Sequence, residues 1–277
     1  MKRIICVITL SLCLIPAFAQ KYNIVLGKTS GNSGVSSQWV AKMRSSILQG
    51  LTSTGRLDVV DGAAMNGLPS VTSEAILKLK EAGIQYYLEA TLETITTSTE
   101  TYDGKTSYKA KMEYTYQLYD VSSGATVSNM KDSHYGSSTN GYDAAIADSF
   151  SLVDNDIVSM VNNVFRVSAE IKAVNETHPK KGIKSVYLGA GSSDGVTKDN
   201  IFEIFKVMDV AGEKITEKIG EMKVVEVKSA NLSLCNVTKG GKELQDAMDN
   251  EIPVQVTSRP SNVIPPVIID VVNGLLL

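Results

Sequence analysis

The residues whose spacing most directly suggests chemistry are three glycines in the segment VYLGAGSSDGVTKDNIFEIF, which runs from Val186 to Phe205. They are Gly189, Gly191 and Gly195. Glycines placed this way after a strand let the backbone approach the pyrophosphate of a dinucleotide, with a helix N-terminus facing the phosphates. That fingerprint needs a glycine at position 194, where this chain has Asp194, and the IFEIFKV run that follows alternates with the period of a strand. We therefore predict no bound cofactor, and a tight turn at Asp194-Gly195 within a β-structure.

The histidines and the acidic runs do not suggest a metal or a nucleophilic site. We predict that His134 and His178 are solvated, because no carboxylate or cysteine stands at ligand spacing around either of them. The run Asp154-Asn155-Asp156 lacks the glycine of an EF-hand loop and falls within a helical pattern, so we place it on a solvated helix face. No G-x-S-x-G elbow occurs in the chain. The sequence therefore predicts neither a metal site nor an enzyme.

The first 19 residues have the composition of a secretory signal peptide. Met1–Arg3 is positively charged, Ile4–Phe18 is almost wholly apolar, and Ala17-Phe18-Ala19 offers small residues for cleavage. We expect the mature chain to begin at about residue 20 and to be exported, either to the periplasm or to the outer membrane. A leucine precedes Cys13 where a lipoprotein peptidase needs a small residue, so we expect no lipid anchor.

Charge and cysteine content narrow the class of partner. The chain has 27 basic and 30 acidic residues, a net charge of −3, and no cluster of Lys or Arg, which argues against nucleic acid. Of its three cysteines only Cys235 lies outside the expected signal peptide, so the mature chain forms no internal disulfide. The alternating NLSLCNV segment predicts that Cys235 is a buried structural thiol.

The pattern of the remaining chain predicts an α+β domain over residues 20–175, a polar linker over 176–182 and a small all-β barrel over 183–259. In the first domain we expect a sheet with helices packed on one face. Apolar residues at helical spacing predict a first helix around Trp39–Leu51, a second over Glu74–Ala82 and one long helix over Ile146–Val164. Val167–Val174 is predicted to close this domain as a strand.

Strand alternation dominates the middle of the first domain. In the predicted strand Ser107–Tyr119 one face is apolar or aromatic, and its residues are Tyr108, Ala110, Met112, Tyr114, Tyr116 and Leu118. Beyond residue 182 we find short strands separated by turns and no helical period longer than one turn, which is typical of a small barrel.

A Pro-containing tail over residues 260–277 ends the sequence. Its apolar residues are candidates for docking on a partner: Val267, Ile268, Ile269, Val271, Leu275 and Leu276. The alternative is that the tail packs on its own protein.

Three segments of the first domain resemble the CsgG/LpoB-type periplasmic domain, which is related to the TolB N-terminal domain. They are Arg56–Asp61, Ala82–Ile95, and Leu118–Val127 with its D-V-x-x-G turn. The segment from Val186 to Val237, with its G-x3-D-G turn and x-F-x-I strand, resembles the C-terminal β-barrel of flagellar assembly protein T. These resemblances imply work in the cell envelope without catalysis.

The sequence thus favours a non-enzymatic, exported cell-envelope protein that serves as an assembly or interaction module. Expected partners are envelope proteins or further copies of this chain in a homo-oligomer, with association to the outer membrane left open. The alternative is a binding module for a glycan such as peptidoglycan or for a small envelope ligand, in which tyrosines supply a stacking platform: Tyr86, Tyr87, Tyr108, Tyr114 and Tyr116. A secretion-channel subunit is less favoured, because the TITTSTETY strand is too polar on both faces for a lipid-facing band.

Overall fold

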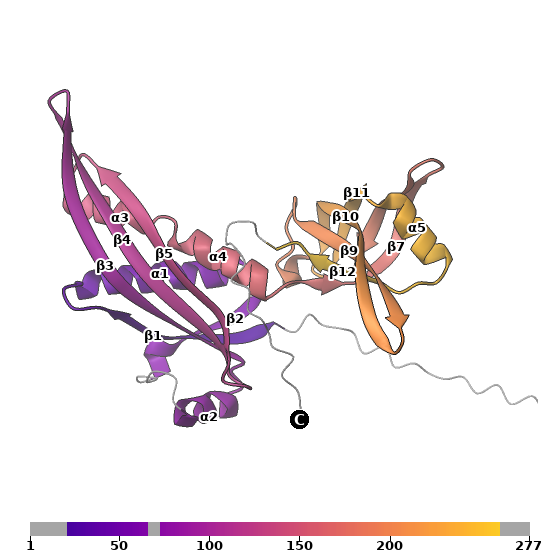
Figure 1. The fold of residues 1–277 in the computed structure, drawn as a ribbon, viewed down its shortest axis with the longest axis horizontal. Coiled ribbons are helices and arrows are strands. Elements are labelled where there is room, and N and C mark those ends of the chain that lie inside the picture. The colour runs from indigo at the N-terminus through magenta and orange to yellow at the C-terminus, as the bar shows by residue number, and fades with distance from the viewer. Residues whose placement is uncertain (1–20, 66–72, 261–277) are drawn as a thin grey trace, which may run out of the picture.

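The computed structural model describes residues 21–65 and 73–260, which form two lobes joined side by side (Figure 1). The expected signal peptide and the candidate docking residues of the tail, Val267, Ile268, Ile269, Val271, Leu275 and Leu276, lie outside the described residues. None of the helices in the described ranges is long and apolar enough to span a bilayer.

The first lobe is built on a five-stranded mixed sheet with the order β2-β1-β3-β4-β5. Its strands are β1 (Tyr22–Gly31), β2 (Leu57–Asp61), β3 (Tyr86–Tyr102), β4 (Lys105–Asp120) and β5 (Thr126–Ser138). β1 runs parallel to both β2 and β3, whereas β3, β4 and β5 form an antiparallel meander. As the last strand of the meander, β5 lies at the edge of the sheet, where it contacts the helices of this lobe.

Three helices share the main core of the first lobe on one face of the sheet: α1 (Ser37–Ser53), α3 (Tyr142–Ser149) and α4 (Val153–Val164). A shorter helix, α2 (Ser73–Glu81), packs on the other face, where Leu79 joins Val25 and Tyr87 in a separate small core. The predicted single helix over Ile146–Val164 is therefore wrong, because the chain breaks between α3 and α4 at residues 150–152. No proline or glycine marks this break, and the buried Phe150 keeps the apolar spacing in phase across it.

The predicted alternation of β4 is confirmed. Ala110, Met112, Leu118 and the two tyrosines between them, Tyr114 and Tyr116, are at most 2% exposed and line the main core. Tyr87 is buried as well, against α2. These three tyrosines fill the interior of the protein, so they cannot form a stacking platform for a glycan.

The second lobe is a curled, antiparallel, seven-stranded half-barrel with the order β6-β12-β9-β10-β11-β8-β7. Its strands are β6 (Ser168–Ala169), β7 (Ile171–His178), β8 (Gly182–Leu188), β9 (Ile201–Val210), β10 (Glu213–Ser229), β11 (Leu232–Lys239) and β12 (Val254–Ser258). The predicted fold class, an α+β sheet followed by a small all-β barrel, is confirmed, with the barrel in the form of an open half-barrel. Because the order of pairing leaves β6 and β7 as edges, the sheet curls without closing.

Two element predictions fail in this lobe. The Val167–Val174 segment pairs with β12 and β8 of the half-barrel and adds no strand to the first sheet. Strand alternation reports which face is buried but not which sheet a strand joins, so the sequence pattern could not decide this. A helix, α5 (Gly241–Asp249), also lies beyond residue 182; it buries only Leu244 and Ala247, too few apolar positions for a visible helical period.

The glycine-rich segment forms the predicted tight turn. Gly195 has a φ of +68° and ends a short 3₁₀ turn over Ser192–Asp194, where the Asp194 carboxylate accepts a 2.7 Å hydrogen bond from the Gly191 N–H. The turn also lies at the joint between the lobes: a Cβ atom built on Gly195 would stand 2.1 Å from the Thr54 carbonyl oxygen. The glycine is therefore required both for its left-handed backbone and for close approach of the two lobes.

Cys235 is fully buried in the half-barrel core, as predicted, and burial raises the pKa of its thiol to about 12. Because the thiolate is the nucleophilic form, this cysteine is chemically inert in the folded protein.

An ion-pair network in the half-barrel predicts acid sensitivity. Glu221 on β10 pairs with Lys218 at 2.8 Å and Lys239 at 2.9 Å, and these contacts lower the pKa of Glu221 to about 2. A carboxyl group with a depressed pKa stabilises the fold above its ordinary value of 4.5, and this contribution is lost as the pH falls through 4.5 toward 2. We expect the Tm of Glu221→Gln to depend less on pH over this window than the wild-type Tm, measured by circular dichroism.

The matched control is Glu226→Gln, which removes a carboxylate of the same strand that is itself 57% exposed, against 10% for Glu221. Its pH profile should follow the wild type, because an exposed pair contributes little to stability. Parallel profiles for the wild type and Glu221→Gln would contradict the prediction.

Candidate functional site

A cluster of titratable side chains lies between the edge strand β5 and helix α4. Asp132 and His134 are two residues apart on β5, so both face the same side of the sheet. The register pairs Asp132 with Tyr114 and His134 with Met112, both of which are buried beneath the helices. The Asp132 carboxylate and the His134 imidazole therefore both face α4, and Asp156 lies in the first turn of that helix.

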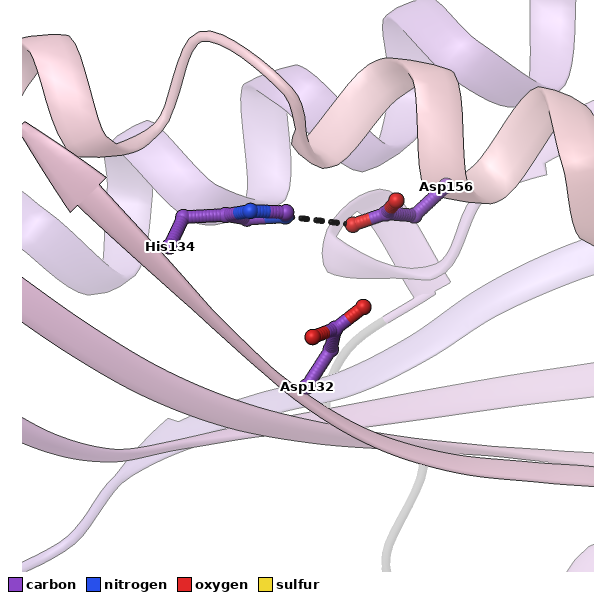
Figure 2. A group of neighbouring side chains, drawn as sticks. All are labelled: Asp132, His134 and Asp156. Carbon is purple, nitrogen blue, oxygen red and sulfur yellow. Dashed lines mark hydrogen bonds and ion pairs between the residues drawn. The ribbon is translucent and has the colours of Figure 1, made fainter. Parts of the chain in front are cut away.

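The three side chains converge on one point (Figure 2). The Nε2 atom of His134 lies 2.5 Å from Oδ2 of Asp156, and the carboxylate of Asp132 points toward the space beneath this pair. The ligand atoms of the three residues all lie within 4.8 Å of one another. The hydroxyl of Tyr114 donates a hydrogen bond to the same Asp156 oxygen.

Burial makes these interactions strong. The side chains of His134 and Asp156 are only 11% and 9% exposed, and Tyr114 is fully buried. The hydrogen bond to Asp156 raises the pKa of His134 above its ordinary value, against the opposing effect of burial. Burial and the negative charge of Asp156 raise the pKa of the Tyr114 phenol, which therefore remains a neutral donor. The cluster can hold a proton on His134, or a cation in its place.

The structure overturns two sequence predictions here. His134 is not solvated, and Asp156 does not lie on a solvated helix face, although Asn155 beside it is exposed. The prediction failed because the partners are 22 residues apart in the sequence and meet only when α4 packs on β5. The sequence does contain a signal of this cluster, the Asp-x-His spacing of β5 opposite an aromatic strand. It identifies inward-facing residues only once the β4–β5 register is known.

No family model matches this chain, and no curated protein matches it. Solved structures match about half of it. A PelC dodecamer from Paraburkholderia phytofirmans is 18% identical with a TM-score of 0.37, covering 52% of this chain and 90% of that one. Lipoprotein GNA1162 of Neisseria meningitidis is 15% identical with a TM-score of 0.35, covering 50% and 98%.

The C-terminal domain of LpoB from Salmonella enterica is 14% identical with a TM-score of 0.28, covering 41% of this chain and 81% of that domain. TM-scores this low do not transfer the function of those proteins to this chain.

Proposed function

We propose that this protein is a non-enzymatic, exported component of the cell envelope that acts as an interaction or assembly module. The signal-peptide pattern of residues 1–19 supports export. Support for the interaction role comes from the two lobes, each of which extends a β-hairpin away from its core (Figure 1).

The β3–β4 hairpin is the observation that carries this proposal. Its strands are 17 and 16 residues long, but the helices cover only the half nearest the core, and every residue from 96 to 106 is exposed. At its tip Tyr102 is 87% exposed, beside the Asp103-Gly104 turn. A two-stranded ribbon gains little stability by itself in water, and an aromatic side chain held out at its end contributes nothing to the core. Both features suit a surface that contacts a partner.

The half-barrel carries a second hairpin of the same kind. Between β9 and β10 the side chains of Val210 and Ile215 are 50% and 45% exposed. In the register Ile215 stands opposite Met208, and Val210 lies two residues from Met208, so all three share one face of the hairpin. The glycan alternative has no comparable support, since three of its five tyrosines are core residues.

Photo-crosslinking at the ribbon tip tests the proposal. With p-benzoylphenylalanine in place of Tyr102, we expect adducts with an envelope protein or a second copy of this chain in intact cells. The matched control is the same replacement at Tyr135, which is 73% exposed on the solvent face of β5. The absence of adducts at position 102, or equal labelling at both positions, would count against the interaction role.

Shortening the ribbon separates interaction from folding. Replacing residues 100–107 by Asn-Gly joins Thr99 to Tyr108, which are paired across the hairpin, through a two-residue turn. Because only exposed residues and the half-buried Ser107 are removed, we expect the Tm to change by no more than about 2 °C. Association, measured by crosslinking in cells and by sedimentation velocity, should be lost. A variant that still associates normally would place the interaction elsewhere.

A further inference from the structure

We propose that Asp132, His134 and Asp156 form a binding site for one divalent transition-metal cation of the Zn²⁺ type, which ties strand β5 to helix α4. This site is separate from the interaction surfaces of the hairpins, and its test is independent of the test of the proposed function.

The donor set fits such a cation. An imidazole nitrogen with two carboxylate oxygens is a ligand combination that Zn²⁺ accepts, whereas Mg²⁺ and Ca²⁺ prefer oxygen ligands alone. With neutral His134 the site holds two negative charges, which a divalent cation balances. Within the described ranges no Lys or Arg forms an ion pair with either carboxylate. Protonated His134 balances only one of the two charges, so the site favours a further positive charge.

The distances are compatible with coordination. For tetrahedral zinc with ligand bonds of about 2.0–2.1 Å, ligand atoms stand about 3.3 Å apart. The three ligand atoms here lie within 4.8 Å of one another, and the His134–Asp156 pair is 2.5 Å apart. Three ligand positions are completed when the closest pair moves apart by about 0.8 Å and the most distant ligand atoms approach by at most about 1.5 Å. In Figure 2 the Asp132 carboxylate already faces the His134–Asp156 pair.

A buried hydroxyl gives an independent indication of a bound ligand. Tyr116 is 1% exposed, lies on the same inward face of β4 as Tyr114, and is close enough to Asp132 and Asp156 for their charges to raise the pKa of its phenol, after the larger effect of burial. Within the described part of the chain its hydroxyl does not complete a hydrogen bond of normal geometry, although the Ser128 side chain lies close to it. Buried polar groups without a partner are rare and often mark a water or an ion. This hydroxyl therefore supports a bound water or ion near the cluster.

Tyr114 has the role of an orienting residue in this arrangement. Its hydroxyl holds the Asp156 oxygen in place, as carboxylate ligands of metals are commonly held by a hydrogen bond from the surrounding protein. The metal would connect an edge strand to the helix layer, so its main effect is on the stability of the first lobe.

Zinc titration of the purified, untagged protein tests the proposal. After EDTA treatment and dialysis, ZnCl₂ should bind with a stoichiometry of one by calorimetry, with micromolar or tighter affinity, and should raise the Tm by several degrees. MgCl₂ at the same concentration should leave the Tm unchanged. Co²⁺ in place of Zn²⁺ should give the visible absorption of a coordinated ion.

Asp132→Asn is the decisive variant. The only hydrogen bond described for its side chain is to the neighbouring Ser133 N–H, so this change should leave the fold intact while weakening zinc binding at least about tenfold. It also keeps every cysteine, which excludes thiol binding as the source of a difference. His134→Gln should weaken zinc binding as well, but it also removes the buried ion pair with Asp156, so its Tm in EDTA is measured alongside to show that it folds. The matched control is His178→Ala, which removes the chain's other histidine and should bind zinc like the wild type.

Three results would overturn the proposal: no saturable zinc binding by the wild type, Asp132→Asn and His134→Gln binding as tightly as the wild type, or Mg²⁺ raising the Tm as much as Zn²⁺. The first would show that the cluster is a structural ion pair only.

Discussion

Replacing Asp156 by alanine is expected to lower the free energy of unfolding by about 3 kcal/mol in the presence of EDTA. The carboxylate accepts hydrogen bonds from two side chains, His134 and Tyr114, in a site where Tyr114 has no access to water. Without Asp156 the Tyr114 hydroxyl is buried without a partner, and His134 loses the group that favours its charged form. EDTA makes this prediction independent of any metal.

Urea unfolding followed by tryptophan fluorescence measures this loss, because Trp39 stacks on Phe150 in the same core, with ring centroids 6.0 Å apart. The control is Asp143→Ala, an exposed carboxylate on α3, which should change the free energy by no more than about 0.5 kcal/mol. A loss for Asp156→Ala that matches the control would mean that the network contributes nothing.

A double-mutant cycle identifies the cause of the loss. Tyr114→Phe removes the hydroxyl that Asp156→Ala leaves without a partner. The double variant should therefore be less destabilised than the sum of the two single variants, by about 1 kcal/mol. Additive losses would assign the effect of Asp156→Ala to packing and to His134 alone.

The sequence predicted the fold best where one periodicity decides the structure. The alternating face of β4 and the buried Cys235 were both identified, because burial on one side of a strand imposes a period of two over many residues. The break between α3 and α4 was missed, since Phe150 is buried in the turn and so continues the apolar spacing. The Val167–Val174 strand was assigned to the wrong sheet, because its pairing depends in part on β12, which lies far along the chain.

The candidate site could not be predicted because its parts have no local spacing. Asp132 and His134 differ from solvated strand residues only in the direction they face, which depends on the register of β5 against β4. Asp156 lies next to the apolar stripe of α4 but within an acidic run, so its composition suggested solvent. A buried carboxylate is unusual enough that its partners must be known before it can be recognised.

Gly195→Ala is expected to destabilise the protein by about 2 kcal/mol and to disturb the joint between the lobes. The glycine has a left-handed backbone, which costs other residues about 1–2 kcal/mol. A Cβ atom there would also stand 2.1 Å from the Thr54 carbonyl oxygen and 2.8 Å from Cγ of Arg56, so the backbones of the two lobes must move apart. Small-angle X-ray scattering should show a larger radius of gyration than in the wild type.

Gly212→Ala separates the two contributions. Gly212 has a φ of +89°, but no atom of residues 21–65 or 73–260 outside its own neighbourhood in the chain lies within 4 Å of the position that its Cβ would occupy. Gly212→Ala has only the cost of the left-handed backbone. Its free energy of unfolding should therefore fall by about 1 kcal/mol, and its scattering curve should stay unchanged. The excess loss in Gly195→Ala then measures the contact between the lobes. Equal losses and equal scattering for both variants would mean that the lobes are held together without the glycine turn, and that Gly195 is needed only for its backbone conformation.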